Sequence, residues 1–360
     1  MPTGSGARGA VLGVFVVLLA GAAWAQRPMS VSIEVPPPAD AGPPSDAAPP
    51  SAAPESVWPR PDPVTVGVHI NDIQSIDLKT HTYAIDAYFW FRWNDPAFDP
   101  ATTMEFINPS DQWGHTIKNH FEAPVVLPNG QRYQVTRVQG RFSKKLPLFN
   151  YPFDRQALEI VFEDSVSEAK DMVFVLGEPA VTINPHLVLP GYEIGQPTVR
   201  VANERYPTHF GDLRAPEPGL YSRLRVEIPV SRPMFAYAVK LLLPVFCVIL
   251  CAGLMFLFAP RYVDARVGVG TMALLSIVAL QMTFNQDLPD VGYLMLMDKI
   301  YICSYLFVIG GLAAVVRTTH LVDEGRVEAG TRLRRGILVA LALGYLGTTG
   351  ALVGQAMAQG

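Results

Sequence analysis

The sequence is poor in cysteine and in charged residues. Only three of its 360 residues are cysteines, and charged side chains make up 17% of the chain. The cysteines all fall inside apolar runs in the last third: Cys247, Cys251 and Cys303. The rest of the chain can therefore form no disulfide. Any domain that it makes must be held by a packed core and by its neighbours.

Motifs of catalysis, metal binding and nucleic-acid binding are also missing. The sequence has no G-x-S-x-G, no H-E-x-x-H, no phosphate-binding loop and no paired C-x-x-C. The pairs His115/His120 and Cys247/Cys251 match metal-ligand spacings only weakly. The histidines are more simply exposed polar residues, and the cysteines are more simply core or lipid-facing residues of an apolar segment. A net charge of −4 without Lys/Arg runs gives no sign of nucleic acid. We expect no enzyme, no metal and no cofactor.

The first 63 residues have the composition of an export signal followed by a linker. Arg8 precedes an apolar core at 11–20, and Ala23-Trp24-Ala25 resembles a cleavage site. We expect residues 1–25 to be a signal peptide. An uncleaved anchor is the alternative, for which the apolar run is short. Residues 26–63 are rich in Pro, Ala and Ser, which predicts a disordered tether.

Residues 64–232 have the alternation and turn signals of a β domain. Apolar residues alternate with others from Val64 to Ile70, a period of two. Pro128-Asn129-Gly130 predicts a turn. Strands are expected at 64–70, 82–93, 131–142, 157–162, 172–176, 192–203 and 220–230. Many short strands without a helical period favour an immunoglobulin-like β-sandwich.

Residues 233–360 are expected to form a transmembrane domain. Four apolar stretches each reach the length of about 20 residues that a helix needs to cross the hydrocarbon of a bilayer. Their expected bounds are about 235–259, 265–286, 291–316 and 334–357. The predicted fold class is therefore an all-β sandwich followed by an all-α bundle of four membrane-spanning helices.

Loop charges predict the orientation of this bundle. The first connection holds Arg261 and Arg266, and the third holds five arginines between 317 and 335. The second connection, at 286–292, has no Lys or Arg. The positive-inside rule places the arginine-bearing connections in the cytoplasm. The sandwich and the C-terminus are then outside, as the export signal also predicts.

One face of the second span has the composition of a pore wall. At 100° per residue its small and apolar residues fall within a stripe about 80° wide, with hydroxyl side chains beside it. An apolar ring can close a pore by dewetting, and acidic rings at the ends set the local ion concentration. The alternative is ordinary helix packing, in which small residues are also common. The candidate pore-lining residues are Asp264, Gly268, Met272, Leu275, Ala279, Met282 and Gln286.

The segment 149–156 (FNYPFDRQ) resembles the signature loop of the pentameric ligand-gated ion channels, the Cys-loop receptor superfamily. Arg232 resembles the arginine that precedes this family's first helix, and Pro244 lies inside the first span as in the family. The segment 265–270 and Leu288-Pro289 resemble its pore helix and the loop that follows. The similarity runs from about residue 64 to 357.

The resemblance implies a homopentamer with ligand sites between neighbouring sandwiches. The loop cysteines are absent and the third connection is short, as in bacterial members, which implies the bacterial inner membrane. Asp264 favours monovalent cations, whereas Ala265-Arg266 matches the anion-selective pattern. We expect cation selectivity, with the anion alternative left open. The ligand is an unknown small molecule or protons.

The resemblance also implies two sets of further residues. Aromatics that could enclose a cationic amine by cation–π contact are Tyr88, Trp90, Tyr206 and Phe210, although aromatics on strands are more often core. Residues expected to couple the sandwich to the helices, with an Asp–Arg cluster at the membrane face, are Asp77, Phe153, Asp154, Arg232 and Pro289.

A membrane-anchored receptor that binds ligand without conducting ions is the competing interpretation. It would need a route for its signal on the other side of the membrane. The sequence offers no cytoplasmic domain for that purpose, which favours the channel.

Overall fold

The computed structural model describes residues 61–111, 114–209, 211 and 219–359. The expected signal peptide and nearly all of the expected tether lie outside these residues. β1 begins at Asp62, so the last two residues assigned to the tether belong to a strand. Proline is tolerated at a strand start, which explains how Pro63 can stand there.

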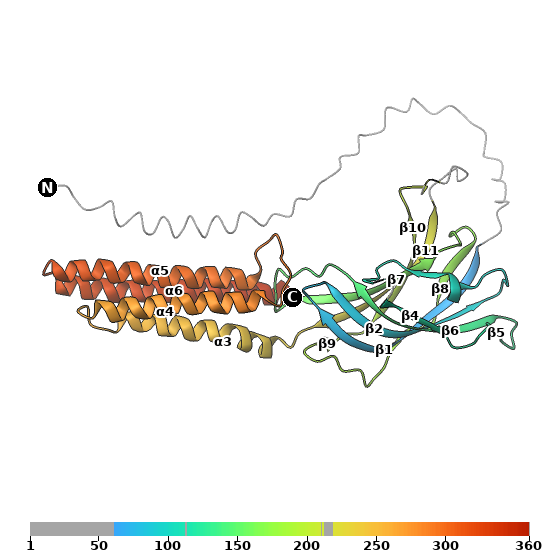
Figure 1. The fold of residues 1–360 in the computed structure, drawn as a ribbon, viewed down its shortest axis with the longest axis horizontal. Helices are drawn as coiled ribbons and strands as arrows, with labels where there is room; N and C mark the ends of the chain where they lie inside the picture. Colours follow the sequence, from blue (N-terminus) through green and yellow to red (C-terminus); the bar gives the residue numbers. More distant parts are fainter. Residues whose placement is uncertain (1–60, 112–113, 210, 212–218, 360) are drawn as a thin grey trace, which may run out of the picture. The chain divides into compact units, whose positions relative to one another are not determined.

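Two sheets form the β domain (Figure 1). The first has the order β4-β6-β2-β1-β8, with β5 paired to β6, and the second has the order β10-β11-β7-β3, with β9 paired to β11. Among the described strands only β1 and β8 pair in parallel. The strands are β1 (Asp62–Asp77), β2 (Thr82–Trp93), β3 (Met104–Phe106), β4 (Thr116–Asn119), β5 (Val125–Val126), β6 (Arg132–Ser143), β7 (Arg155–Asp164), β8 (Met172–Ile183), β9 (Glu193–Ile194), β10 (Thr198–Arg205) and β11 (Leu220–Ser231).

The sequence located the long strands better than the short ones. The turn at 128–130 is confirmed: Gly130 has a φ of 85° and donates its N–H to the Leu127 carbonyl. The expected strand 192–203 is wrong as one element, because β9 and β10 are separate. Between them stand Gly195 and Pro197, and proline cannot donate a hydrogen bond to the ladder.

Aromatic side chains fill the space between the sheets. Phe89 and Phe91 of β2 and Phe162 of β7 are fully buried. The Phe89 and Phe162 rings meet edge to face at 5.2 Å between centroids. Such pairs add about 0.5–1.5 kcal/mol to the free energy gained from burial alone. This core stabilises the sandwich without disulfides, as the position of the cysteines requires.

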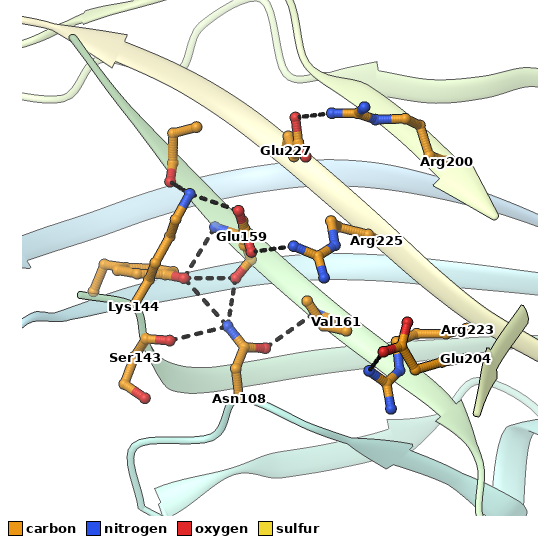
Figure 2. Close-up of polar contacts among 12 residues, drawn as sticks. Asn108, Ser143, Lys144, Glu159, Val161, Arg200, Glu204, Arg223, Arg225 and Glu227 are labelled. Atoms are coloured by element: carbon orange, nitrogen blue, oxygen red, sulfur yellow. Dashed lines mark hydrogen bonds and ion pairs between the residues drawn. The ribbon is translucent and has the colours of Figure 1, made fainter. Parts of the chain in front are cut away.

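A single amide side chain ties the two sheets together (Figure 2). Asn108 donates to the carbonyl oxygens of Ser143 in β6 (3.2 Å) and Glu159 in β7 (2.9 Å). Its own oxygen accepts the N–H of Val161 at 3.0 Å. Since β6 and β7 belong to different sheets, these bonds link the sheets directly.

Ion pairs cover the outer side of the second sheet (Figure 2). The Glu159 carboxylate accepts from Lys144 and from Arg225. Arg200 and Glu227 form a further pair on the neighbouring strands at 2.6 Å. The Arg200 side chain is 68% exposed, so its pair with Glu227 contributes only about 0–1 kcal/mol to stability.

The outer side of the first sheet carries an indole ring laid flat on glycine. Gly67 of β1 pairs with Trp90 of β2, and a Cβ atom on Gly67 would overlap the indole. A Cβ atom on Gly177 of β8 would overlap the same ring. Both positions need glycine because the ring occupies the volume that a side chain would fill.

Four long helices follow, and each is long and apolar enough to cross a membrane. They are α3 (Met234–Gly253, continued by the 3₁₀ turn η2, Leu254–Phe256), α4 (Val263–Asn285), α5 (Leu296–Asp323) and α6 (Val327–Gln359); the short α2 (Pro100–Thr103) lies in the β domain. The predicted fold class, a β-sandwich followed by four membrane-length helices, is confirmed. The chain is a multi-pass membrane protein.

The helix bounds differ from the apolar stretches in a systematic way. α5 begins later than expected because the Asp298 carboxylate accepts the N–H of Met295 and fixes the helix start there. α5 extends at its C-terminal end, and α6 at its N-terminal end, into the charged sequence that connects them. Backbone hydrogen bonds continue through charged residues, so an apolar stretch marks only the part of a helix inside the membrane.

The four helices differ in how much of their surface this chain covers. In the most apolar 18-residue stretch of each helix, 44% of the residues are buried in α5, against 17% in α4 and 6% in α6. α5 is therefore the packed centre of the bundle. α4 and α6 leave most of their surface to something other than this chain.

Because the Trp90 ring lies against Gly67, a side chain at position 67 is predicted to lower the stability of the protein. Gly67→Ala should lower the stability of the folded chain by about 1–3 kcal/mol, because an added methyl group overpacks the site. The measurement is thermal unfolding of the purified full-length protein in detergent.

The matched control removes the ring instead of the glycine. In a Trp90→Ala background the same Gly67→Ala change should have little further effect. An equal loss of stability in both backgrounds would show that the indole is not the cause.

Candidate functional site

A buried ion pair stands where the β domain joins the first helix. Arg232 follows the end of β11 and precedes α3, and its guanidinium donates to the Asp154 carboxylate at 3.0 Å. Their side chains are only 2% and 6% exposed. Two of the predicted coupling residues are thus in direct contact, and water does not screen the contact.

Neighbouring polar groups complete the surroundings of the Asp154 carboxylate. The Gln156 amide donates to its second oxygen at 2.6 Å and also to the Pro147 carbonyl. One oxygen therefore binds Arg232 and the other binds Gln156. A buried carboxylate is stable only when its oxygens are satisfied in this way.

Three tyrosine rings surround the guanidinium of Arg232. Its carbon lies 4.7 Å from the ring centroids of Tyr151 and Tyr192 and 5.7 Å from that of Tyr237. A guanidinium within about 6 Å of a ring centroid is attracted by the ring quadrupole. Arg232 also donates to the Tyr192 hydroxyl at 2.7 Å.

The protonation states in this cluster are set by burial and by the ion pair. Burial raises the pKa of Tyr151 to about 12, although the Arg232 charge opposes the shift. Burial likewise raises the pKa of Tyr192. Burial disfavours the charged form of Arg232 and is the largest single influence, yet Asp154, Tyr192 and Tyr151 together outweigh it and the pKa of Arg232 is raised. Near neutral pH Arg232 is therefore charged, and the phenols of Tyr151 and Tyr192 are neutral.

The segment before β7 is bound to the connection between α4 and α5. Leu148 donates its N–H to the Tyr293 hydroxyl at 2.9 Å, and Leu296 donates its N–H to the Phe149 carbonyl at 2.9 Å. The Phe149 and Tyr293 rings stack with centroids 3.9 Å apart. Phe153, a predicted coupling residue, is 2% exposed and packs in the core cluster of the helices.

The turn between β1 and β2 makes a separate contact. Lys79 donates to the carbonyl oxygen of Gln286 at the end of α4, at 3.1 Å. Asp77 was expected to join the Arg232 cluster, but the described residues show no contact between the two. Its carboxylate instead accepts the N–H groups of Lys79 and Thr80, so it shapes the turn. Pro289 lies half-buried in the α4–α5 connection, next to the buried Leu288.

All seven residues assigned to the pore stripe are exposed on the single chain. Met272, Leu275 and Met282 of α4 are 66%, 58% and 64% exposed. The opposite side of α4 is packed, with these residues buried: Arg266, Gly270, Ala273 and Ile277. The exposed side also carries hydroxyl groups, from Thr271, Ser276 and Thr283.

From the sequence, Arg266 was expected in the connection before the second span, but its side chain is not a loop charge. It is fully buried inside α4 and donates to the Met255 carbonyl (3.0 Å) and the Thr318 hydroxyl (3.2 Å). Met255 belongs to η2, where the helical bonding of α3 has ended. Arg266 thus ties the beginning of α4 to α3 and α5.

The predicted ligand aromatics lie outside the core of the sandwich. Tyr88 and Trp90 share the outer face of β2, and Tyr206 follows β10 in the other sheet. An arginine lies over each ring: Arg137 at 5.4 Å from Tyr88, Arg92 at 5.1 Å from Trp90 and Arg223 at 5.4 Å from Tyr206. Phe210 lies outside the described residues.

These rings therefore do not form one enclosure within the chain. Tyr206 instead donates to the Glu163 carboxylate at 2.6 Å, which also accepts from Arg223. An amine would have to displace a guanidinium to use the same ring face.

Several residues of the junction were missed by sequence reasoning. Tyr192, Tyr237, Tyr293 and Lys79 stand in four separate segments, and no spacing marks them as partners. Tyr293 alone had a signal, since it lies in the connection next to Leu288-Pro289. The others become visible only once the chain is folded.

The buried pair should carry far more free energy than the exposed pairs of the sandwich. Asp154→Asn leaves Arg232 buried without a countercharge, so stability should fall by about 3–5 kcal/mol. Unfolding of the purified full chain by heat or guanidinium in detergent measures the loss.

An exposed pair supplies the control. Glu227→Gln breaks the pair with Arg200, whose side chain is 68% exposed, and should cost about 0–1 kcal/mol. Similar losses in the two variants would mean that burial does not distinguish them.

No family model matches the sequence. A proton-gated ion channel of Gloeobacter violaceus is 25% identical over 307 residues, 81% of this chain and 83% of that protein. The serotonin-gated chloride channel mod-1 of Caenorhabditis elegans is 22% identical over 279 residues, 72% and 55% of the two chains. The acetylcholine-gated chloride channel subunit acc-2 of the same organism is 24% identical over 295 residues, 73% and 62%.

These relatives are named as ion channels that a transmitter or a proton opens. Each match covers 72% or more of this chain, so it includes both the sandwich and the helices. Each of the two nematode proteins is matched over less than two thirds of its length. With the signature loop, the Arg232–Asp154 pair and four membrane-length helices in place, the chain belongs to the superfamily of pentameric ligand-gated ion channels.

Proposed function

We propose that five copies of this chain surround one axis, with α4 from each copy lining an ion pore. A signal received by the sandwiches opens this pore. The observation that carries the proposal is the exposed stripe of α4. It combines small, apolar and hydroxyl residues, whereas the exposed side chains of α6 include Val339, Leu343 and Leu346, as lipid contact requires.

The narrowest part of the proposed pore is formed by apolar side chains. Leu275 and Ala279 are one helical turn apart on the stripe, and Met272 and Met282 flank them. Five leucine side chains around an axis give a dry constriction, which stops ions by excluding water. Small outward tilts of α4 would widen it enough to admit water.

The junction supplies the route by which the sandwich moves α4. Lys79 contacts the last turn of α4, and Phe149 contacts the connection between α4 and α5. The Arg232–Asp154 pair holds the start of α3 to the signature loop. A ligand that binds one arrangement of these contacts more tightly than the other shifts the closed–open equilibrium by that difference in affinity.

The signal is a small molecule bound between neighbouring sandwiches, or protons. Tyr88, Trp90 and Tyr206 remain the candidate contacts, together with the arginines that lie over their rings. Phe210 is a further candidate. The first relative is named as proton-gated and the second as serotonin-gated, so both kinds of signal occur among the relatives.

Monovalent cations are the proposed permeant ions. Asp264 is exposed in the first turn of α4, while Arg266, two residues later, is fully buried. A buried guanidinium does not face the axis, so the acidic ring dominates the potential there. The proposed location is the bacterial inner membrane with the sandwich on the periplasmic side, which the arginine-bearing connections support.

Water accessibility along α4 tests the pore. After replacement of the native cysteines, Met272→Cys, Leu275→Cys and Gln286→Cys should react with a membrane-impermeant thiol reagent and block current. Ile277→Cys, on the packed side of α4, should react much more slowly. The readouts are the rate of thiol labelling and the current in bilayers during pH steps and with a panel of amines.

Two results would contradict the proposal in different ways. Equal reaction rates on the two sides of α4 would mean that the stripe does not face water. A pentamer that reacts at the stripe but carries no current under any condition would favour the non-conducting receptor.

Asp264 is expected to set the charge selectivity. Asp264→Asn should move the reversal potential in a NaCl gradient toward zero, and Asp264→Lys should move it toward the chloride potential. Asp323→Asn is the control, because that residue lies at the end of α5. An unchanged reversal potential in both Asp264 variants would place the selectivity elsewhere.

A further inference from the structure

A cavity lies between the β domain and the α4–α5 connection, apart from the candidate ligand aromatics. Its volume is about 420 Å³, and it is lined from three segments of the chain. His81 comes from the turn before β2, Lys145 and Phe149 precede β7, and Tyr293 lies in the connection. Cavities of this size hold small organic molecules.

The polar side chains that line the cavity are all hydrogen-bond donors. Lys145 carries an ammonium group, which donates only. His81 accepts the Leu146 N–H through Nδ1 at 3.4 Å, so in the neutral ring the proton is on Nε2. The Tyr293 hydroxyl accepts the Leu148 N–H, and its own proton has no acceptor among the described residues.

Among the residues that the structure describes, no carboxylate lines the cavity to balance these donors. Lys144 makes the contrast clear, because its ammonium pairs with Glu159 at 2.5 Å. Lys145, the next residue, is exposed and has no ion-pair or hydrogen-bond partner among the described residues. The cavity thus has a net positive lining and unused donors.

The rest of the lining is apolar. Leu146, Pro147 and Val291 contribute aliphatic surface, and the stacked rings of Phe149 and Tyr293 contribute an aromatic wall. A molecule that matches this lining needs an anionic group for the donors and a compact apolar body for the remainder.

We infer that this cavity is a second ligand site, one that takes a small organic anion such as a monocarboxylate with an apolar body. The anion is bound by Lys145, His81 and Tyr293, and its body lies against Phe149. Phe149 and Tyr293 also make the contacts between the β domain and the α4–α5 connection. The bound anion therefore modulates gating from a place distinct from the sites between sandwiches.

The probe for this site is 4-fluorobenzoate, and the readout is binding rather than current. Fluorine NMR on the purified full chain in phosphatidylcholine nanodiscs should show saturable binding. Lys145→Gln removes the only full charge of the lining and should weaken the apparent Kd at least about tenfold. Lys145 is exposed, so the variant should elute and unfold like the parent protein.

Lys118→Gln is the matched control, because Lys118 is an exposed lysine on the edge strand β4 and does not line the cavity. It should leave the Kd unchanged. No saturable binding to the parent chain, or the same Kd in Lys145→Gln as in the parent, would overturn the inference. Either result leaves the pore proposal untouched, since that rests on accessibility of α4.

Nanodiscs of different composition identify the source of the anion. If phosphatidylglycerol displaces 4-fluorobenzoate from the parent chain, the natural occupant is the headgroup of an anionic lipid. If it does not, the occupant is a soluble carboxylate. Both results require the site, and they differ only in what fills it.

Discussion

The contact between Arg232 and Asp154 removes two full charges from water at the point where two differently built domains meet. Moving a charge out of water costs several kcal/mol, and only a close partner with satisfied hydrogen bonds offsets that cost. Here the partners are the carboxylate itself, Gln156 and three tyrosine rings. These groups come from the signature loop and the start of β7, the segment before β9, the residue after β11, and α3, so the pair is stable only while these segments keep their relative positions.

The helices show a second constraint, which acts on the assembly. α5 finds its packing within the chain, whereas α4 and α6 do not. Two kinds of uncovered surface then need two kinds of surroundings. The exposed aliphatic side chains of α6 suit lipid. The exposed amide and carboxylate of α4 would be costly there, so their presence supports a neighbour or water on that side.

The sequence predicted the architecture because hydrophobic periodicity depends only on local order along the chain. Alternation marked the long strands, and apolar length marked the four spans. The signature loop led to Asp154 and Phe153, and helical spacing led to the exposed side of α4.

Contacts between residues that lie far apart in the sequence could not be predicted in this way. Tyr192 and Tyr237 reach Arg232 from different elements, and no pattern in either segment depends on the other. The Asp77 carboxylate accepts the N–H groups of its own turn, and such a local bond competes with any distant partner. Arg266 had the sequence position of a loop charge, and only the packing of η2 and α5 around it shows that it is internal.

The amide of Asn108 has a mechanical consequence. Sheets that pack only through apolar side chains can slide over each other at small cost, since dispersion contacts have little direction. The bonds from Asn108 to β6 and β7 are directional, and shear between the two layers would break them. The sandwich should therefore turn as one rigid body, so that a displacement at its far end arrives at Lys79 and Phe149 undiminished.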